Sequence, residues 1–134
     1  MNWAAAADAY QAALAIRTEL QAAAPAIEDV AGLARIALGQ GQLDHARQHA
    51  DRCVAYLDAH GVEGIEFPMQ VYLTSYDVLQ ATGDLATARR VLEAAHALLL
   101  RRANAVSDPA LRDSMLQNVA ANRRVLAEWE AAAR

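Results

Sequence analysis

The chain contains no lysine, and this absence excludes one large class of enzyme. All 12 of its basic residues are arginine. A phosphate-binding loop of the Walker A type needs a lysine that reaches the β- and γ-phosphates, so the sequence excludes an ATPase or GTPase built on that loop. The single cysteine, Cys53, excludes an internal disulfide. Its place on the apolar side of a predicted helix indicates a buried thiol without a redox or zinc-binding role.

Long apolar runs and a strong positive charge are also missing. No segment reaches the roughly 18 apolar residues of a membrane span, and the first residues lack the basic start of a signal peptide. We therefore expect a cytoplasmic protein with no membrane partner. The formal net charge is −4, with arginines and acidic residues intermixed, and this pattern disfavours a nucleic-acid partner.

Alanine, by contrast, makes up about a quarter of the chain. Hydrophobic residues make up 55% of the sequence, whereas aromatic residues make up only 5% of it. Alanine has the highest helix propensity, and its small side chain lets helices approach closely. The apolar fraction is sufficient for a core. We expect an all-α fold in one domain covering residues 1–134. This domain is either the whole protein or a part of a longer one.

Apolar residues recur at spacings of three and four, the period of an amphipathic helix. Glycines and prolines separate these stretches, and no segment alternates as a strand does. The short turns between neighbours favour antiparallel packing, and the last helix is expected to be long and to cap the stack. The pattern predicts about six helices, over residues 2–21, 25–38, 43–60, 68–81, 84–105 and 110–131.

Two stretches 42 positions apart (83 − 41) repeat the pattern Gly-x-Leu-x-x-Ala-Arg, over residues 41–47 and 83–89. An arm that starts at Trp3 shares the spacing of the small residues. These arms resemble the second helix of a tetratricopeptide repeat, which opens with Gly-Asp-aromatic-x-x-Ala. The resemblance implies a TPR-like α-solenoid of helical hairpins, with a concave wall lined by residues 28–38 and 69–80. It also implies a role in protein–peptide recognition.

A second resemblance covers the C-terminal half. Residues 71–79, 94–99 and 111–119 look like the tail of large bacterial ATPase or nucleotide-cyclase regulators, in which helical repeats follow the catalytic modules. This resemblance implies that the chain is the helical end of a longer bacterial protein. No segment resembles the ATPase or cyclase part itself.

The implied solenoid geometry turns five side chains toward the concave wall: Arg35, Gln70, Tyr72, Asp77 and Gln80. Arginine can hold a carboxylate with two hydrogen bonds, tyrosine supplies contact area, and glutamine can bond to an extended peptide backbone. We therefore expect a non-enzymatic scaffold that binds a peptide or protein segment, without a cofactor. The alternative is that these residues are ordinary solvated or inter-helix side chains.

The last predicted helix suggests a different function. If the apolar side chains of Met115, Leu126 and Trp129 face outward, they would form a homodimer interface. An enzyme remains only as a metal site at His45 and His49, which lie four residues apart on one helix face. No third ligand occurs at a fixed spacing, so we expect no metal.

Overall fold

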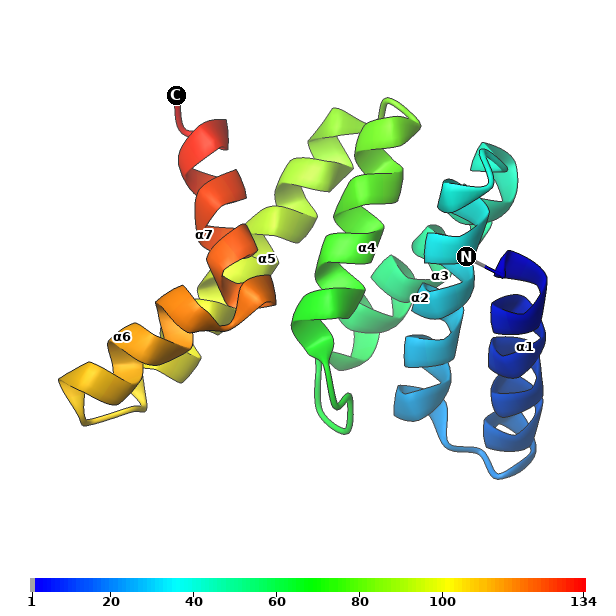
Figure 1. Cartoon of the computed structure of the whole chain (residues 1–134), viewed down its shortest axis with the longest axis horizontal. Coiled ribbons are helices and arrows are strands. Elements are labelled where there is room, and N and C mark those ends of the chain that lie inside the picture. Colours follow the sequence, from blue (N-terminus) through cyan, green and yellow to red (C-terminus); the bar gives the residue numbers. More distant parts are fainter. Residues whose placement is uncertain (1) are drawn as a thin grey trace.

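The computed structural model describes residues 2–134, which form seven α-helices and no strand. The all-α fold expected from the composition is therefore confirmed. Figure 1 shows the helices following one another across the molecule, with α1 at one end and α6 and α7 at the other. The helices are α1 (Trp3–Glu19), α2 (Ala23–Gly39), α3 (Leu43–His60), α4 (Pro68–Ala81), α5 (Leu85–Asn104), α6 (Pro109–Asn118) and α7 (Ala120–Ala132).

The same tight turn follows α1, α2 and α4. In each turn one residue has a positive φ: Gln21 at 58°, Gly41 at 74° and Gly83 at 81°. The amide of the next residue donates to the carbonyl oxygen five residues before it, at 2.8 to 2.9 Å, which is the Schellman arrangement that ends a helix. Glycine adopts a positive φ without a steric penalty. Glycine therefore suits the second and third turns. The first turn lies where the sequence predicted a helix end, near residue 21, but glutamine adopts the positive φ there.

Helices α2 and α4 form the centre of the molecule. Ten residues of each are buried. Helix α2 packs against α1, α3 and α4, whereas α4 packs against α2, α3, α5 and α7. The largest fully buried side chains include Leu79 of α4 and Leu92 and Leu99 of α5. A helix that is apolar on most sides must be enclosed, so the other helices are arranged around these two.

Helix α1 contacts α2 through two aromatic rings that lie over glycines. A Cβ atom added at Gly32 would lie 2.4 Å from the ring of Tyr10, and one added at Gly39 would lie 2.4 Å from the ring of Trp3. Both distances are far shorter than van der Waals contact, so the rings can approach α2 this closely only where it has no side chain. The aromatic pair and the glycine pair have the same seven-residue spacing, which keeps each pair on one helix face.

Replacing Gly32 with alanine tests this contact. In a free helix the change stabilises by about 1 kcal/mol. Here the added methyl group must displace the Tyr10 ring, so we expect Gly32→Ala to lower the free energy of unfolding by about 1–3 kcal/mol. Urea unfolding followed by circular dichroism measures this energy.

The control is the same substitution in a Tyr10→Ala background. Without the ring, Gly32→Ala should stabilise the protein, so the sign of the effect should reverse. An equal stabilisation in both backgrounds would show that the ring does not constrain α2.

The prediction of one long C-terminal helix is wrong. The chain breaks at Val119, whose φ is −87° and ψ is 115°, and α6 and α7 meet at an angle (Figure 1). The side-chain amide of Asn122 donates to the carbonyl oxygen of Met115 at 3.2 Å. In a continuous helix the carbonyl of Met115 would accept from the main-chain amide of Val119. At the break, the Asn122 side chain takes the place of that amide. The break lets α7 pack against α4 and α5 and bury Val125 completely.

Cys53 is buried, as its sequence position predicted. Its exposed fraction is 0%, and its Sγ atom lies 3.8 Å from the carbonyl oxygen of Ile27. Burial raises the pKa of the thiol to about 12 because the thiolate would lose its hydration. A buried neutral thiol is a poor nucleophile and a poor metal ligand.

Two measurements test the state of Cys53. A disulfide exchange reagent at pH 8 should leave the native thiol unmodified and react with it in urea.

The folded thiol keeps its proton to a higher pH than the unfolded thiol. Its contribution to stability is therefore complete below about pH 9, the usual thiol pKa, and declines as the pH rises toward 12. Cys53→Ala should lose this part of the alkaline destabilisation; an identical pH profile would contradict the assignment.

Candidate functional site

A hollow of about 350 Å³ lies where α1, α2 and the start of α4 meet. It brings together two of the residues singled out in the sequence, Arg35 of α2 and Gln70 of α4. The connection between α3 and α4 forms part of its wall. The other polar and aromatic residues that line it are Tyr10, Arg17, Glu28, Asp29, Glu66 and Phe67.

Arg35 is positioned in this hollow by two neutral partners. Its Nη1 donates to Oγ1 of Thr74 at 3.1 Å, and its Nη2 donates to the hydroxyl of Tyr10 at 3.1 Å. One guanidinium therefore connects α1, α2 and α4. Within residues 2–134, no carboxylate lies within 4.0 Å of Arg35. Since a guanidinium has five N–H donors in a planar fork, it retains donors for an acceptor outside the chain.

Two of the three carboxylates that line the hollow are bound within the chain. Nη1 of Arg17 donates to both oxygens of Asp29, at 2.8 and 2.9 Å, and the Asp29 side chain is only 5% exposed. Oε1 of Glu28 accepts a hydrogen bond from the main-chain amide of Phe67 at 2.7 Å, which connects α2 to the segment before α4. Glu66 is exposed and forms no ion pair with any other described residue.

Tyr72 lies away from this hollow. It is 8% exposed and borders a smaller hollow between α3 and α5, which Asp58 and Arg90 also line. Those two residues form an ion pair at 2.8 Å. Residues two apart on a helix point in nearly opposite directions, and Gln70 and Tyr72 border different hollows.

Asp77 and Gln80 face α7 instead of the hollow. Asp77 accepts two hydrogen bonds from the guanidinium of Arg124, so its carboxylate is already engaged. Nε2 of Gln80 donates to the hydroxyl of Tyr76 at 2.6 Å, and that hydroxyl donates to Oε2 of Glu128 at 3.2 Å. Burial, followed by the Glu128 carboxylate, raises the pKa of Tyr76. These contacts fix α7 against α4.

The three residues proposed for a homodimer interface lie at contacts within the chain. Met115 and Leu126 are half-buried against the main core. Trp129 stacks on His96 of α5, with ring centroids 4.4 Å apart and an interplanar angle of 12°, and the guanidinium of Arg89 lies 5.8 Å from its ring. The homodimer interface stays a prediction.

Phe67, the only phenylalanine of the chain, was not among the residues predicted to form the site. Its side chain is 56% exposed. It borders both the hollow at Arg35 and a neighbouring hollow of about 360 Å³ beside the start of α7. Exposed aromatic residues are enriched at protein interfaces. A large aromatic residue in a connecting segment of a chain with so few aromatics was the available signal.

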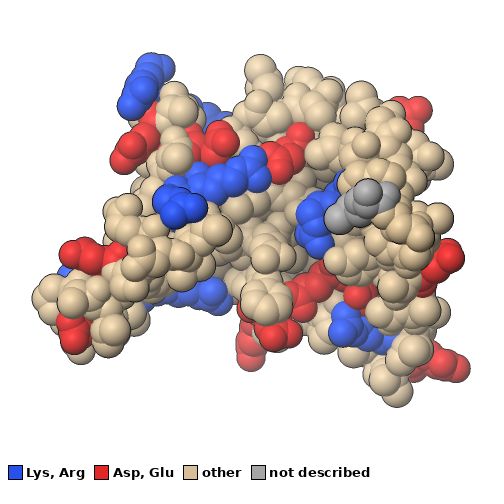
Figure 2. Space-filling view, in the orientation of Figure 1, with Lys and Arg blue, Asp and Glu red and all other residues tan. Residues whose placement is uncertain are grey.

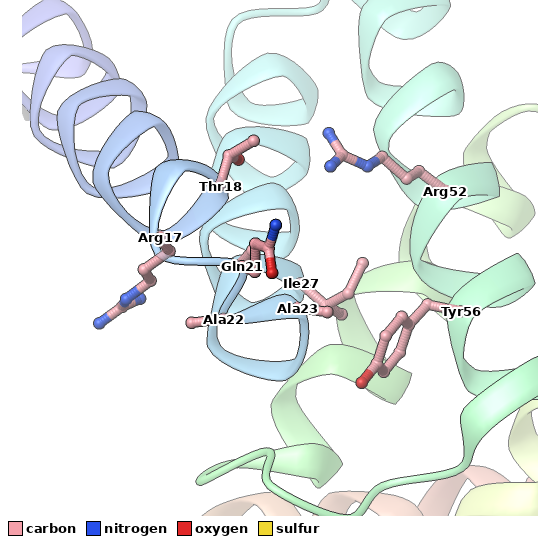
Figure 3. A pocket seen from close by; sticks show the side chains of 9 residues that line it. Arg17, Thr18, Gln21, Ala22, Ala23, Ile27, Arg52 and Tyr56 are labelled. Atoms are coloured by element: carbon pink, nitrogen blue, oxygen red, sulfur yellow. The ribbon is translucent and has the colours of Figure 1, made fainter.

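A further hollow of about 340 Å³ lies between α1, α2 and α3. Figure 3 shows Arg52 and Tyr56 extending from α3 toward it and the guanidinium of Arg17 turned away. That guanidinium donates to the carbonyl oxygen of Pro25 at 3.2 Å as well as to Asp29. Most of the surface that lines the hollow is apolar.

Within residues 2–134, no cluster of three or more histidine, cysteine, aspartate or glutamate side chains could hold a metal ion. His45 and His49 therefore have no third ligand in this part of the chain. None of the described helices combines the length and apolar character needed to cross a membrane. Figure 2 shows acidic and basic side chains intermixed on the face it presents.

Comparison with known proteins does not assign the chain to a family. No family model matches it, and neither curated proteins nor solved structures include a match to it.

Replacing Arg17 with methionine tests the buried ion pair beside the hollow. The change keeps most of the side-chain volume and leaves the Asp29 carboxylate buried without a partner. Removing one member of a buried pair costs about 3–5 kcal/mol, and the partial exposure of Arg17 reduces this, so we expect a loss of about 2 kcal/mol. Urea unfolding at neutral pH measures it. The double variant Arg17→Met, Asp29→Leu should recover most of the loss; no recovery would locate the damage elsewhere.

Proposed function

We propose that the chain is a non-enzymatic protein-interaction module that binds an extended peptide or protein segment over the hollow at Arg35. The observation that carries this proposal is the guanidinium of Arg35, which three helices position and which has no carboxylate partner within the described chain. A carboxylate of the partner would complete this site with two parallel hydrogen bonds. The bound segment therefore carries an acidic side chain or a free C-terminus at this point.

The neighbours of Arg35 suit an extended segment. The exposed ring of Phe67 offers apolar contact area beside the charge. Gln70 is exposed on the same wall, and its amide can both donate to and accept from a peptide backbone. Because the hollow at Arg35 and the hollow beside α7 share Phe67 and Gln70, a segment longer than a few residues can continue from one to the other.

We further propose that the helices form a TPR-like α-solenoid with this hollow on its concave face. The repeated arginines of the two Gly-x-Leu-x-x-Ala-Arg stretches support an internal repeat. Arg47 of α3 donates to Oγ1 of Thr82 and to Asp84, at 3.0 and 2.7 Å, where α4 ends. Arg89 of α5 donates to the carbonyl oxygen of Ala132 at 3.2 Å, where α7 ends. The arginines at equivalent positions of the two stretches therefore each bond at the end of another helix, α4 for Arg47 and α7 for Arg89.

Peptide selection tests the function. A library of random displayed peptides is selected on the immobilised protein, and the recovered sequences are remade as fluorescent peptides with acidic or amidated side chains. We expect acidic sequences to be recovered. Arg35→Ala should weaken their binding about tenfold, close to 1.4 kcal/mol, by fluorescence anisotropy. Amidation of the peptide carboxylate should cause a similar loss in the parent protein and little further loss in Arg35→Ala.

Arg101→Ala is the matched control, because Arg101 is exposed on α5 and lies outside the hollow. It removes the same charge and should leave peptide affinity nearly unchanged. Circular dichroism must show the same helix content in both variants. Equal affinity of Arg35→Ala and Arg101→Ala for every selected peptide would refute the proposal.

A further inference from the structure

A single residue, Val119, connects α6 to α7. Its φ and ψ are ordinary extended values, so the connection itself carries no backbone strain. Residues 110–131 contain neither glycine nor proline, and their apolar spacing continues through the break. The segment is therefore compatible with two conformations: the broken one of the structure, and one continuous helix.

The two conformations differ in what stabilises them. A continuous helix would gain the main-chain hydrogen bonds that are missing at the break. In the broken form, the carbonyl of Met115 accepts from the side chain of Asn122 instead, and that of Gln117 accepts from Arg123 at 3.4 Å. Two side-chain bonds are a weaker arrangement than continued helix. The packing of α7 against α4 and α5 must therefore favour the broken form.

That packing consists of contacts between α7 and the body of the chain. Val125 is fully buried, and Arg124 pairs with Asp77 of α4. Trp129 stacks on His96 of α5. All of these contacts depend only on the α7 sequence, so α7 from a second copy of the chain can form every one of them.

We infer that α7 exchanges between two copies of this chain. In the exchanged dimer, α6 and α7 of each copy form one continuous helix, and its α7 part packs on α4 and α5 of the other copy. Figure 1 shows the angle between α6 and α7, so a continuous helix cannot keep α7 in its present place on its own body. Each chain retains its α7 contacts with α4 and α5, and main-chain helical hydrogen bonds replace the Asn122–Met115 and Arg123–Gln117 bonds across the break. Exchange of a terminal element that keeps its own packing contacts is a low-cost route to a dimer. The inference does not depend on peptide binding at Arg35.

Charge reversal of one ion pair tests the exchange. In Asp77→Arg, the introduced arginine on α4 repels Arg124 of α7. In Arg124→Asp, the introduced aspartate on α7 repels Asp77 of α4. If the two variants are mixed and refolded together from urea, exchange places opposite charges at both sites. One site regains the original pair, and at the other the introduced arginine meets the introduced aspartate. We expect each variant alone to be mainly monomeric by light scattering and the mixture to form a one-to-one dimer, detected by mass spectrometry of the intact complex.

The double variant Asp77→Arg, Arg124→Asp is the control. It restores the pair within one chain and should recover the thermal stability of the parent. A mixture that stays monomeric, while the double variant recovers this stability, would overturn the exchange. A dimer that forms equally well from either single variant would also overturn it, because that dimer would not need α7 to cross.

Substitution of Val119 provides a second test, which does not need the charge-reversed variants to fold. Alanine favours a continuous helix over glycine by about 1 kcal/mol, or roughly fivefold per chain. A dimer contains two such segments. The dimer dissociation constant of Val119→Gly should therefore exceed that of Val119→Ala roughly 30-fold, measured by sedimentation over a concentration series. Equal constants, or a monomer at every concentration in Val119→Ala, would contradict the inference.

Discussion

The contact between α2 and α4 is the constraint on which the rest of the structure depends. Both helices are buried on most sides, so neither is stable without the helices around it. The polar side chains that enter this region are bonded internally. Ser75 donates to the carbonyl oxygen of Val71 at 2.9 Å, and Asp29 is paired with Arg17. No buried side-chain nitrogen or oxygen of the described residues lacks a partner, so the centre is both apolar and fully satisfied.

Much of the fold could be predicted because its signals are local. Gly41 and Gly83 ended helices where the sequence indicated, since a residue without a side chain suits a positive φ. The end of α1 near residue 21 was also predicted, with the next helix beginning at Pro25. The break at Val119 could not be located in this way. Val119 is compatible with helix, and its conformation depends on a contact made elsewhere, because α7 must pack on α4 and α5. Residues 2–134 therefore form seven helices where the pattern predicted six.

The candidate site was predicted only in part, and for a related reason. Arg35 of α2 and Gln70 of α4 border the same hollow, because the exposed faces of the two helices meet there. Tyr72 and Asp77 also follow the helical period, but a sequence does not specify which neighbour each side of a helix meets. Tyr72 is buried, and the carboxylate of Asp77 is bound to Arg124. Asp77 is engaged because α7 packs beside it. The position of α7 depends on the break at Val119, which the sequence pattern did not indicate.

The two aromatic contacts at the ends of the helix row have a consequence for spectroscopy. The chain has two tryptophans: Trp3 lies against α2 over Gly39, and Trp129 stacks on His96. Both belong to peripheral helices, and neither lies between α2 and α4. Intrinsic tryptophan fluorescence therefore reports on the two edges of the molecule, whereas circular dichroism follows all of its helices. If the tryptophan emission changes at a lower denaturant concentration than the helix content, the two edges of the molecule separate while its centre remains folded.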